Sequence, residues 1–178
     1  MKQLCAILLL LCVLLCAVSC AEESEVPENT QNAATENAKF NLYVPVAWTS
    51  LADSGVSGAR SNNSDANVTV TAYLADDVGL TPERYWNEKC YPQYTAQNAP
   101  LSDNFALMQE QCGDTTLGGR DAKRYVFVYT LDNVNYEVMQ IITNKDDVIY
   151  TLTFTAKAEN YGSYADTVEQ IRANFTFR

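Results

Sequence analysis

The chain has 178 residues, with 12 basic and 22 acidic side chains, a formal net charge of −10 and no histidine. So acidic a chain repels nucleic-acid phosphates, which argues against a nucleic-acid partner. Without histidine it has no base for Ser-His-Asp or Cys-His catalysis, and it lacks the commonest metal ligand. We therefore expect no metal site and no cofactor.

The first segment, residues 1–19, has the features of a secretory signal peptide. Lys2 supplies a positive start, and an unbroken apolar run extends from Leu4 to Val18. A membrane-spanning helix requires about 20 apolar residues, which is more than this run contains. Its length instead suits the apolar region of a signal peptide. We expect residues 1–19 to be removed on export.

The expected cleavage point precedes Cys20, which we interpret as a lipid attachment site. Ser19, a small residue, stands directly before it, and Ala17 stands three residues before it. This stretch resembles the lipobox of bacterial lipoproteins, although leucine is usual at the place of Ala17. Two or more acyl chains anchor a protein stably at a membrane. We expect a lipid anchor on the extracytoplasmic side of the cell membrane; secretory cleavage without a lipid is the alternative.

The segment after the cleavage point is polar and acidic. It is rich in glutamate, and Val26 is its one large apolar residue. Such a segment cannot bury enough surface to offset the entropy of ordering. We therefore expect residues 20–38 to form a disordered acidic tether, and residues 39–178 to form one domain.

Three strands are expected in the first part of this domain. The segment Phe40–Trp48 alternates, and Pro45 marks the end of its strand. A short edge strand is expected at Gly58–Ser61. The run Asn67–Ala75 is rich in valine and threonine and alternates throughout, which predicts a longer strand.

A helix is expected to begin at Thr81 and to run to Tyr91. Thr81 suits the N-cap, and Pro82 suits the first helical turn. Pro92 should limit or kink this helix, because proline has no N–H to donate. Residues 104–111 are expected to form another strand.

The strongest pattern predicts three long consecutive antiparallel strands within residues 118–156. Asp132-Asn133 is a two-residue loop of the kind that forms a primed hairpin turn, and residues 145–147 make a second turn. The stretches YVFVY and VMQII are apolar at both alternating positions, so these strands should be covered on both faces. Gly118-Gly119 is expected to be a tight bend, since a phosphate loop would lead into a helix.

The last element is expected to be an amphipathic helix. Tyr164, Val168, Ile171 and Phe175 are spaced 4, 3 and 4 residues apart, so they share one helix face. The final stretch FTF should add one more extended piece.

The order of these elements resembles the PsbP-like superfamily. The resemblance rests on the opening strand with Pro45 and Trp48, the stretch LGGRDAKRY, three strands ending in YTLTFTA, and a helix before the terminal NFTF. The superfamily includes photosystem II extrinsic subunits, DcrB-type envelope proteins and Ran-binding Mog-type proteins. It implies an α+β fold, a three-layer α/β/α sandwich around a mainly antiparallel sheet. An NTF2-like cone is the alternative fold. The resemblance transfers no functional residue.

A disulfide is expected between Cys90 and Cys112. The cysteines other than these two and Cys20 lie in the expected signal peptide. An exported chain meets an oxidising compartment, at least in a periplasm, where a disulfide persists. Two buried free thiols are the alternative.

The candidate binding site is an aromatic group in and around the first expected helix: Tyr85, Trp86, Tyr91 and Tyr94. Aromatic side chains with polar tips can line a surface that binds a ligand or partner. Tyr85 and Trp86 are adjacent, so they cannot both face inward on one helix. The alternative is that the group caps the core.

Two groups of charged residues also have chemistry that could form a site. Arg120, Lys123 and Arg124 are the one basic concentration and could dock an acidic partner, but a solvated strand end is the simpler interpretation. Asp76-Asp77 and Asp146-Asp147 carry oxygen ligands for hard cations; here too we favour solvated turns.

These features predict an extracytoplasmic binding or assembly lipoprotein rather than an enzyme. Its partner would be a protein or small molecule at the cell envelope. One alternative is a carrier with a small-ligand pocket between sheet and helix. The other is a hydrolase of cell-wall glycans that uses a pair of carboxylates.

Overall fold

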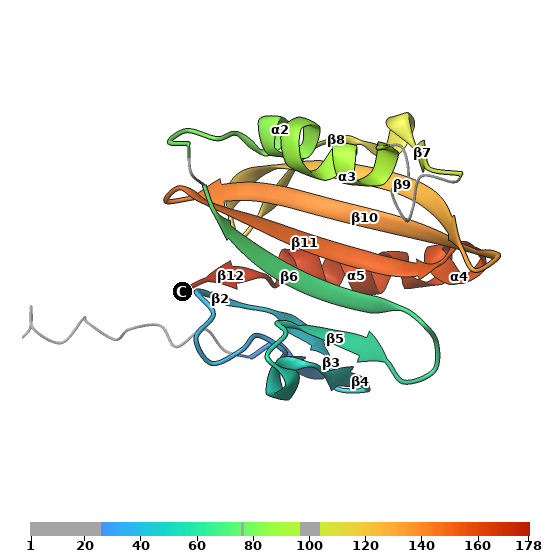
Figure 1. Cartoon of the computed structure of the whole chain (residues 1–178). Coiled ribbons are helices and arrows are strands. Elements are labelled where there is room, and N and C mark those ends of the chain that lie inside the picture. The colour runs from blue at the N-terminus through green and yellow to red at the C-terminus, as the bar shows by residue number, and fades with distance from the viewer. Residues whose placement is uncertain (1–25, 76, 97–103) are drawn as a thin grey trace, which may run out of the picture.

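The structure, a computed structural model, describes residues 26–75, 77–96 and 104–178. An antiparallel sheet carries one helical segment on one face and the C-terminal helices on the other (Figure 1). This is the arrangement expected of an α/β/α sandwich. None of the described helices is both long enough and apolar enough to cross a membrane.

Within the described residues, eight strands build the central sheet. They are β4 (Trp48–Ser50), β5 (Gly58–Ser61), β6 (Asn67–Leu74), β7 (Ala106–Leu107), β8 (Gly113–Leu117), β9 (Arg120–Leu131), β10 (Val134–Lys145) and β11 (Val148–Lys157). Their order is β4-β5-β6-β11-β10-β9-β7, and β8 pairs with the first half of β9. The strands expected at residues 58–61 and 67–75 are present, but β5 is not the expected edge strand, because the added strand β4 pairs along its outer side. Residues 104–111 contain only β7 and a 3-10 turn at Gln109–Gln111.

The three long strands β9, β10 and β11 are joined by two tight turns. Asp132 and Asn133 have φ angles of 51° and 64°, and Asp146 and Asp147 have 54° and 61°. Positive φ at both central residues is the signature of the primed turn, whose twist matches that of the flanking strands. Aspartate and asparagine tolerate this conformation better than other non-glycine residues. Both predicted hairpins are therefore confirmed.

The domain begins earlier in the chain than the sequence predicts. Strand β1 (Thr30–Asn32) lies inside the segment expected to be a tether, and it pairs with β3 (Tyr43–Pro45). Ala33 is fully buried, and its N–H donates to the carbonyl of Leu42 at 2.8 Å. The tether prediction is thus wrong for residues 30–38. Backbone hydrogen bonds to a neighbouring strand hold this segment, so it needs few apolar side chains of its own.

The helical segment on one face of the sheet runs past its proline. It consists of α2 (Pro82–Tyr85), a π-helical stretch (Trp86–Cys90) and α3 (Tyr91–Thr95). The hydroxyl of Thr81 accepts a hydrogen bond from the N–H of Arg84 at 3.2 Å, which confirms the predicted N-cap. Pro92 does not end the helix. The wider π turn just before α3 changes the hydrogen-bond spacing there, and Pro92 falls in the first turn of α3, where its missing N–H is tolerated.

The opposite face carries α4 (Ala158–Tyr161) and α5 (Ala165–Ala173). The predicted stripe is present, because Val168, Ile171 and Phe175 are buried against the sheet. The last strand, β12 (Thr176–Phe177), pairs with β2 (Phe40–Asn41), which joins the two ends of the domain.

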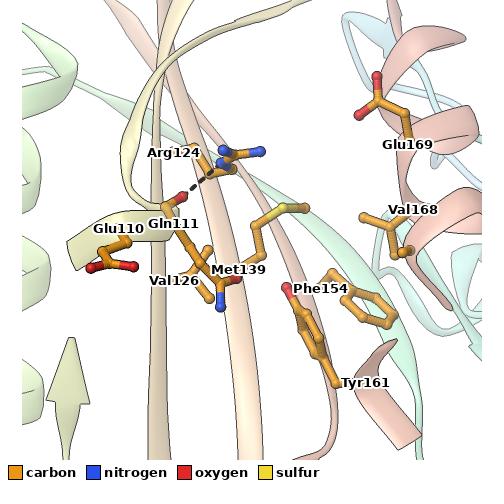
Figure 2. A pocket seen from close by; sticks show the side chains of 10 residues that line it. Glu110, Gln111, Arg124, Val126, Met139, Phe154, Tyr161, Val168 and Glu169 are labelled. Carbon is orange, nitrogen blue, oxygen red and sulfur yellow. Dashed lines mark hydrogen bonds between the residues drawn. The ribbon is translucent and has the colours of Figure 1, made fainter. Parts of the chain in front are cut away.

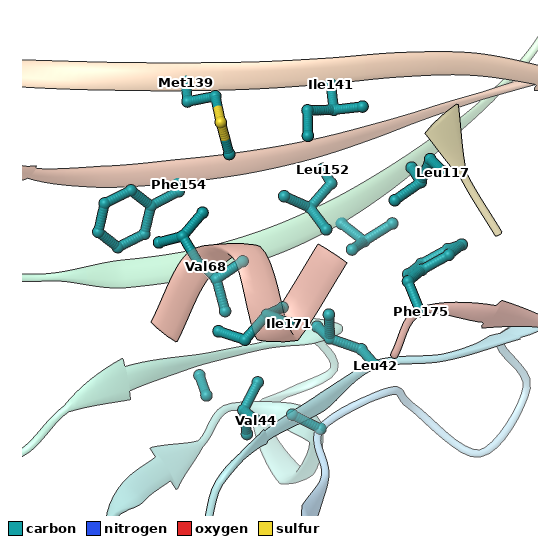
Figure 3. Packing of buried hydrophobic residues seen from close by; sticks show 14 of the residues in the cluster. Leu42, Val44, Val68, Leu117, Met139, Ile141, Leu152, Phe154, Ile171 and Phe175 are labelled. Atoms are coloured by element: carbon teal, nitrogen blue, oxygen red, sulfur yellow. The ribbon is translucent and has the colours of Figure 1, made fainter. Parts of the chain in front are cut away.

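Side chains alternate between two apolar layers along each long strand. On β10, Met139 and Ile141 face α5 and belong to the main core (Figure 3). Val138 and Ile142 belong to the second layer, under α2 and α3. The expectation that these strands are covered on both faces is confirmed.

Candidate functional site

A cavity of about 280 Å³ lies between the sheet and the C-terminal helices (Figure 2). Strands β9, β10 and β11 form its floor. Helices α4 and α5 and the turn at Gln109–Gln111 form its walls. This volume lies just below the range of about 300–1,000 Å³ that is typical of drug-sized sites. It suits a smaller molecule.

The floor is apolar because one row of side chains crosses three strands. The sheet register pairs Met139 with Val126 on β9 and with Phe154 on β11. Side chains paired in this way point to the same face of a sheet. Val168 of α5 packs in the same core and lines the cavity from the helix side. The interior therefore suits the hydrocarbon part of a ligand.

Arg124 brings a positive charge to this cavity. It stands two residues before Val126 on β9, so both point to the same face of the sheet. Its Nε donates a hydrogen bond to the backbone carbonyl of Gln111 at 2.9 Å (Figure 2). Within residues 26–75, 77–96 and 104–178, its two terminal nitrogens have neither a hydrogen-bond nor a salt-bridge partner. The guanidinium is thus oriented through one nitrogen, and its remaining donors are unused.

Two carboxylates, those of Glu110 and Glu169, also line the cavity. Arg172 donates from Nε to Oε2 of Glu169 at 2.9 Å, and these hydrogen bonds lower the pKa of Glu169. The Glu169 charge is therefore already paired. Arg172 also donates to the carbonyl of Thr116 at 2.9 Å, which ties α5 to β8. Glu110 is exposed at the mouth.

The hydroxyl of Tyr161 is a second unused donor. Figure 2 shows its oxygen pointing from α4 into the space near Met139. Burial raises the pKa of Tyr161 well above its ordinary value, and nearby Glu137 adds to the rise. The phenol therefore keeps its proton at neutral pH. Among the described residues, this hydroxyl has no hydrogen-bond partner.

The acidic groups in and around the cavity lie in different surroundings. A glycan hydrolase needs one carboxylic acid with a raised pKa to protonate the leaving group. The pKa of Glu169 is lowered, whereas burial raises the pKa of Glu137, which acts on Tyr161 beside the cavity. The other lining carboxylate, Glu110, is exposed to solvent rather than enclosed. No group of three or more metal-binding side chains occurs in the part of the chain that the structure describes.

The aromatic group expected to bind a ligand lies on the other face of the sheet. Trp86 is only 2% exposed and stacks on Tyr125, with 4.1 Å between ring centroids. Tyr94 packs on Phe127, and its hydroxyl accepts a hydrogen bond from Gln140 at 3.0 Å. These rings fill the second apolar layer, as the alternative interpretation proposed.

The other two members of that group are less deeply placed. Tyr85 packs beside Tyr73, with 5.4 Å between ring centroids, and Tyr91 is 40% exposed. The adjacent pair Tyr85 and Trp86 thus faces two directions, as their spacing requires, but both rings still contact the sheet layer. None of the four lines the cavity beneath α5.

The predicted disulfide is absent, and Cys90 and Cys112 are free thiols. Cys90 is buried in the second apolar layer, where burial raises its pKa to about 11. The sulfur of Cys112 accepts a hydrogen bond from the N–H of Val126 at 3.4 Å. Each thiol is held by its own surroundings, which the sequence spacing of the pair did not reveal. Cys20 lies outside the described residues.

Of the basic concentration on β9, only Arg124 reaches the cavity. Lys123 forms a salt bridge with Asp114 at 2.6 Å, and Arg120 is exposed at the start of the strand. The sequence did carry a signal for Arg124, because it alternates with Ala122 and Val126 on one strand face. A charged residue on an otherwise apolar face indicates a polar feature within a core.

No protein-family model matches this chain, and no curated protein matches it. Several solved structures do match it. Cyanobacterial PsbP (CyanoP) from Synechocystis sp. PCC 6803 superposes with a TM-score of 0.60 at 12% identity, over 90% of this chain and 98% of that one. PA94 of Pseudomonas aeruginosa, a protein of unknown function, has a TM-score of 0.56 at 13% identity, over 84% and 98%.

A third neighbour is LpqN of Mycobacterium tuberculosis, which is described as involved in cell envelope biogenesis. It has a TM-score of 0.51 at 15% identity, over 77% of this chain and 82% of LpqN. The three neighbours share the fold and little sequence. The protein therefore has a PsbP-like α+β fold, which confirms the sandwich predicted from the sequence.

Proposed function

We propose that this protein is a membrane-anchored binding protein of the cell envelope and that the cavity beneath α5 is its binding site. The observation that carries the proposal is an apolar floor beside two unused donors, Arg124 and Tyr161. An apolar pocket with a few convergent polar groups is the usual form of a small-ligand site. This combination favours the small-ligand carrier among the alternatives.

Two further observations support a role in binding at the envelope. The cavity offers a preformed space but no nucleophile paired with a base among its described lining residues. One structural neighbour, LpqN, is described as involved in cell envelope biogenesis. Because the likeness between them is one of fold, it supports the compartment more than the ligand.

A photo-crosslinking amino acid at position 165 tests the binding site in cells. Ala165 is exposed and lines the cavity, so the probe would face the ligand. We expect an adduct visible in the intact mass after irradiation. Ala173 is exposed at the other end of α5 and does not line the cavity, which makes it the matched control. Equal adducts at both positions, or none at position 165, would contradict the proposed site.

The anchor is proposed at Cys20, with the chain on the extracytoplasmic side. A thioether-linked lipid there would account for the short apolar run and the small residues before the cysteine. Metabolic labelling with a fatty-acid analogue should mark the wild type and Cys16→Ala, while Cys20→Ala should carry no label. Label retained in Cys20→Ala would contradict the anchor without bearing on the cavity.

A further inference from the structure

We propose that the cavity beneath α5 binds a small amphipathic carboxylate, with its carboxylate on Arg124 and Tyr161 and its hydrocarbon body on the apolar floor. This inference rests on the proposed function, since it names the chemical class that the same site accepts. It follows from the charge, the donor geometry and the volume of the cavity.

The described lining of the cavity carries two carboxylates, Glu110 and Glu169, and one guanidinium, whose unused donors are the feature that favours an anion. Arg124 is the one cation among its described lining residues, and its terminal nitrogens have no partner there. Glu169 is hydrogen-bonded to Nε of Arg172, and its interaction with Arg124 is limited to the attraction between the two charges. Glu110 is exposed, so solvent screens its charge.

One further acid lies close by, Glu137 of β10, on the same strand face as Met139. Burial raises the pKa of its carboxyl group. A cationic ligand would have to approach the unpaired guanidinium of Arg124. An anionic ligand would be attracted to the guanidinium of Arg124, the one cation among the described lining residues.

The donors have the geometry that a carboxylate uses. A guanidinium presents parallel N–H groups that match both oxygens of a carboxylate. The bond from Nε of Arg124 to the Gln111 carbonyl holds the plane of the group in place (Figure 2). Tyr161 adds a neutral O–H donor from α4, close enough to Arg124 for the positive charge to act on the phenol. A neutral ligand would leave the Arg124 donors without an anionic acceptor.

The volume limits the size of the ligand. At about 30 Å³ for each water of liquid volume, 280 Å³ corresponds to roughly nine waters, or on the order of nine ligand atoms other than hydrogen. The row Val126, Met139 and Phe154 contacts the body of such a molecule without offering it a hydrogen bond. A short aliphatic acid such as hexanoate satisfies these conditions.

Titration calorimetry with hexanoate, hexanol and hexylamine tests the chemical class. The full chain would be measured in lipid nanodiscs, with empty nanodiscs subtracted to remove partition into lipid. We expect hexanoate to bind at least about tenfold more tightly than hexanol, because hydrogen bonds to a charged group add that much. Hexylamine should bind more weakly than hexanol.

Three variants separate the charge, the hydroxyl and the space. Arg124→Gln should weaken hexanoate at least about tenfold and leave hexanol unchanged, which would show that the cavity itself is intact. Tyr161→Phe should weaken hexanoate by a few-fold. Ala165→Phe should abolish binding of both ligands by filling the mouth, whereas Ala173→Phe on the same helix should not.

Each outcome decides a different question. Equal affinity for hexanoate and hexanol, or unchanged hexanoate affinity in Arg124→Gln, would overturn the carboxylate assignment while leaving the cavity as a binding site. Failure of all three probes to bind the wild type would also overturn the carboxylate assignment. The crosslink at position 165 would then decide separately whether the cavity binds any ligand.

Discussion

Gly118 shows how one residue permits the close packing at the end of the main core. Its φ is +58°, in the left-handed region that glycine adopts most readily. A Cβ at this position would lie 2.7 Å from Cδ2 of Phe177. Gly119 also has a positive φ, +74°, but no heavy atom lies within 4 Å of the position of its Cβ. The two glycines therefore differ in crowding and share the same backbone requirement.

We expect Gly118→Ala to destabilise the protein more than Gly119→Ala. Each alanine adopts a left-handed conformation at a cost of about 1–2 kcal/mol, and crowding against Phe177 adds about 1–3 kcal/mol at position 118. Urea unfolding followed by tryptophan fluorescence gives both free energies. Equal losses would show that the Phe177 ring moves aside at no cost.

At the scale of elements, β1 decides where the domain begins. It pairs with β3. In Ala33, the residue directly after β1, both the N–H and the carbonyl form hydrogen bonds to other segments. The N–H of Ala33 donates to Leu42 at 2.8 Å, and its carbonyl accepts from Gly58 at 2.9 Å. The side chain of Asn32 also accepts from the N–H of Leu42 at 3.1 Å. This short polar segment thus connects β3 to β5, which pairs with both β4 and β6 in the central sheet.

A truncated chain that starts at Lys39 should be less stable than one that starts at Val26. The shorter chain loses the β1–β3 ladder and the bonds of Ala33, each worth about 0.5–1.5 kcal/mol, so we expect a loss of at least about 2 kcal/mol in the free energy of unfolding. Thermal and urea unfolding of the two chains gives the difference. Indistinguishable stabilities would restore the tether as first predicted, up to residue 38.

At the scale of the whole molecule, phenols and a thiol are buried on both faces of the sheet. Burial raises the pKa of Tyr85 and Tyr125 to about 12 from 10.0, and that of Cys90 to about 11 from 9.0. It also raises the pKa of Tyr161 beside the cavity. In each case the folded state holds its proton more tightly than the unfolded state does.

Stability should therefore fall on the alkaline side. A raised folded-state pKa contributes stability that is complete below the unfolded value and is lost as the pH rises through the folded value. We expect the urea midpoint to be level up to about pH 9 and to decline from there to about pH 12. Tyr161→Phe should flatten part of this decline. A midpoint that stays constant to about pH 12 would contradict the burial of these phenols.

The sequence by itself determined the features that depend on neighbouring residues. The turns at Asp132-Asn133 and Asp146-Asp147 were predictable because few residues accept positive φ. The stripe ending at Phe175 was predictable because its spacing follows the helical period. The apolar runs of β9 and β10 indicated cover on both faces, which agrees with the sandwich that the resemblance to the PsbP-like superfamily implied.

Only the tertiary structure decided features that depend on contacts between distant segments. The cavity exists because the register of β9, β10 and β11 sets Val126, Met139 and Phe154 in one row beneath α5. No local pattern encodes that register together with the position of the helix. The inward stacking of Trp86, the separate surroundings of Cys90 and Cys112, and the docking of β1 on β3 likewise arise from pairing partners far along the chain. Intrinsic propensity determines helix and strand formation over a few residues. Which face of each helix or strand is buried, and against which partner, depends on tertiary packing.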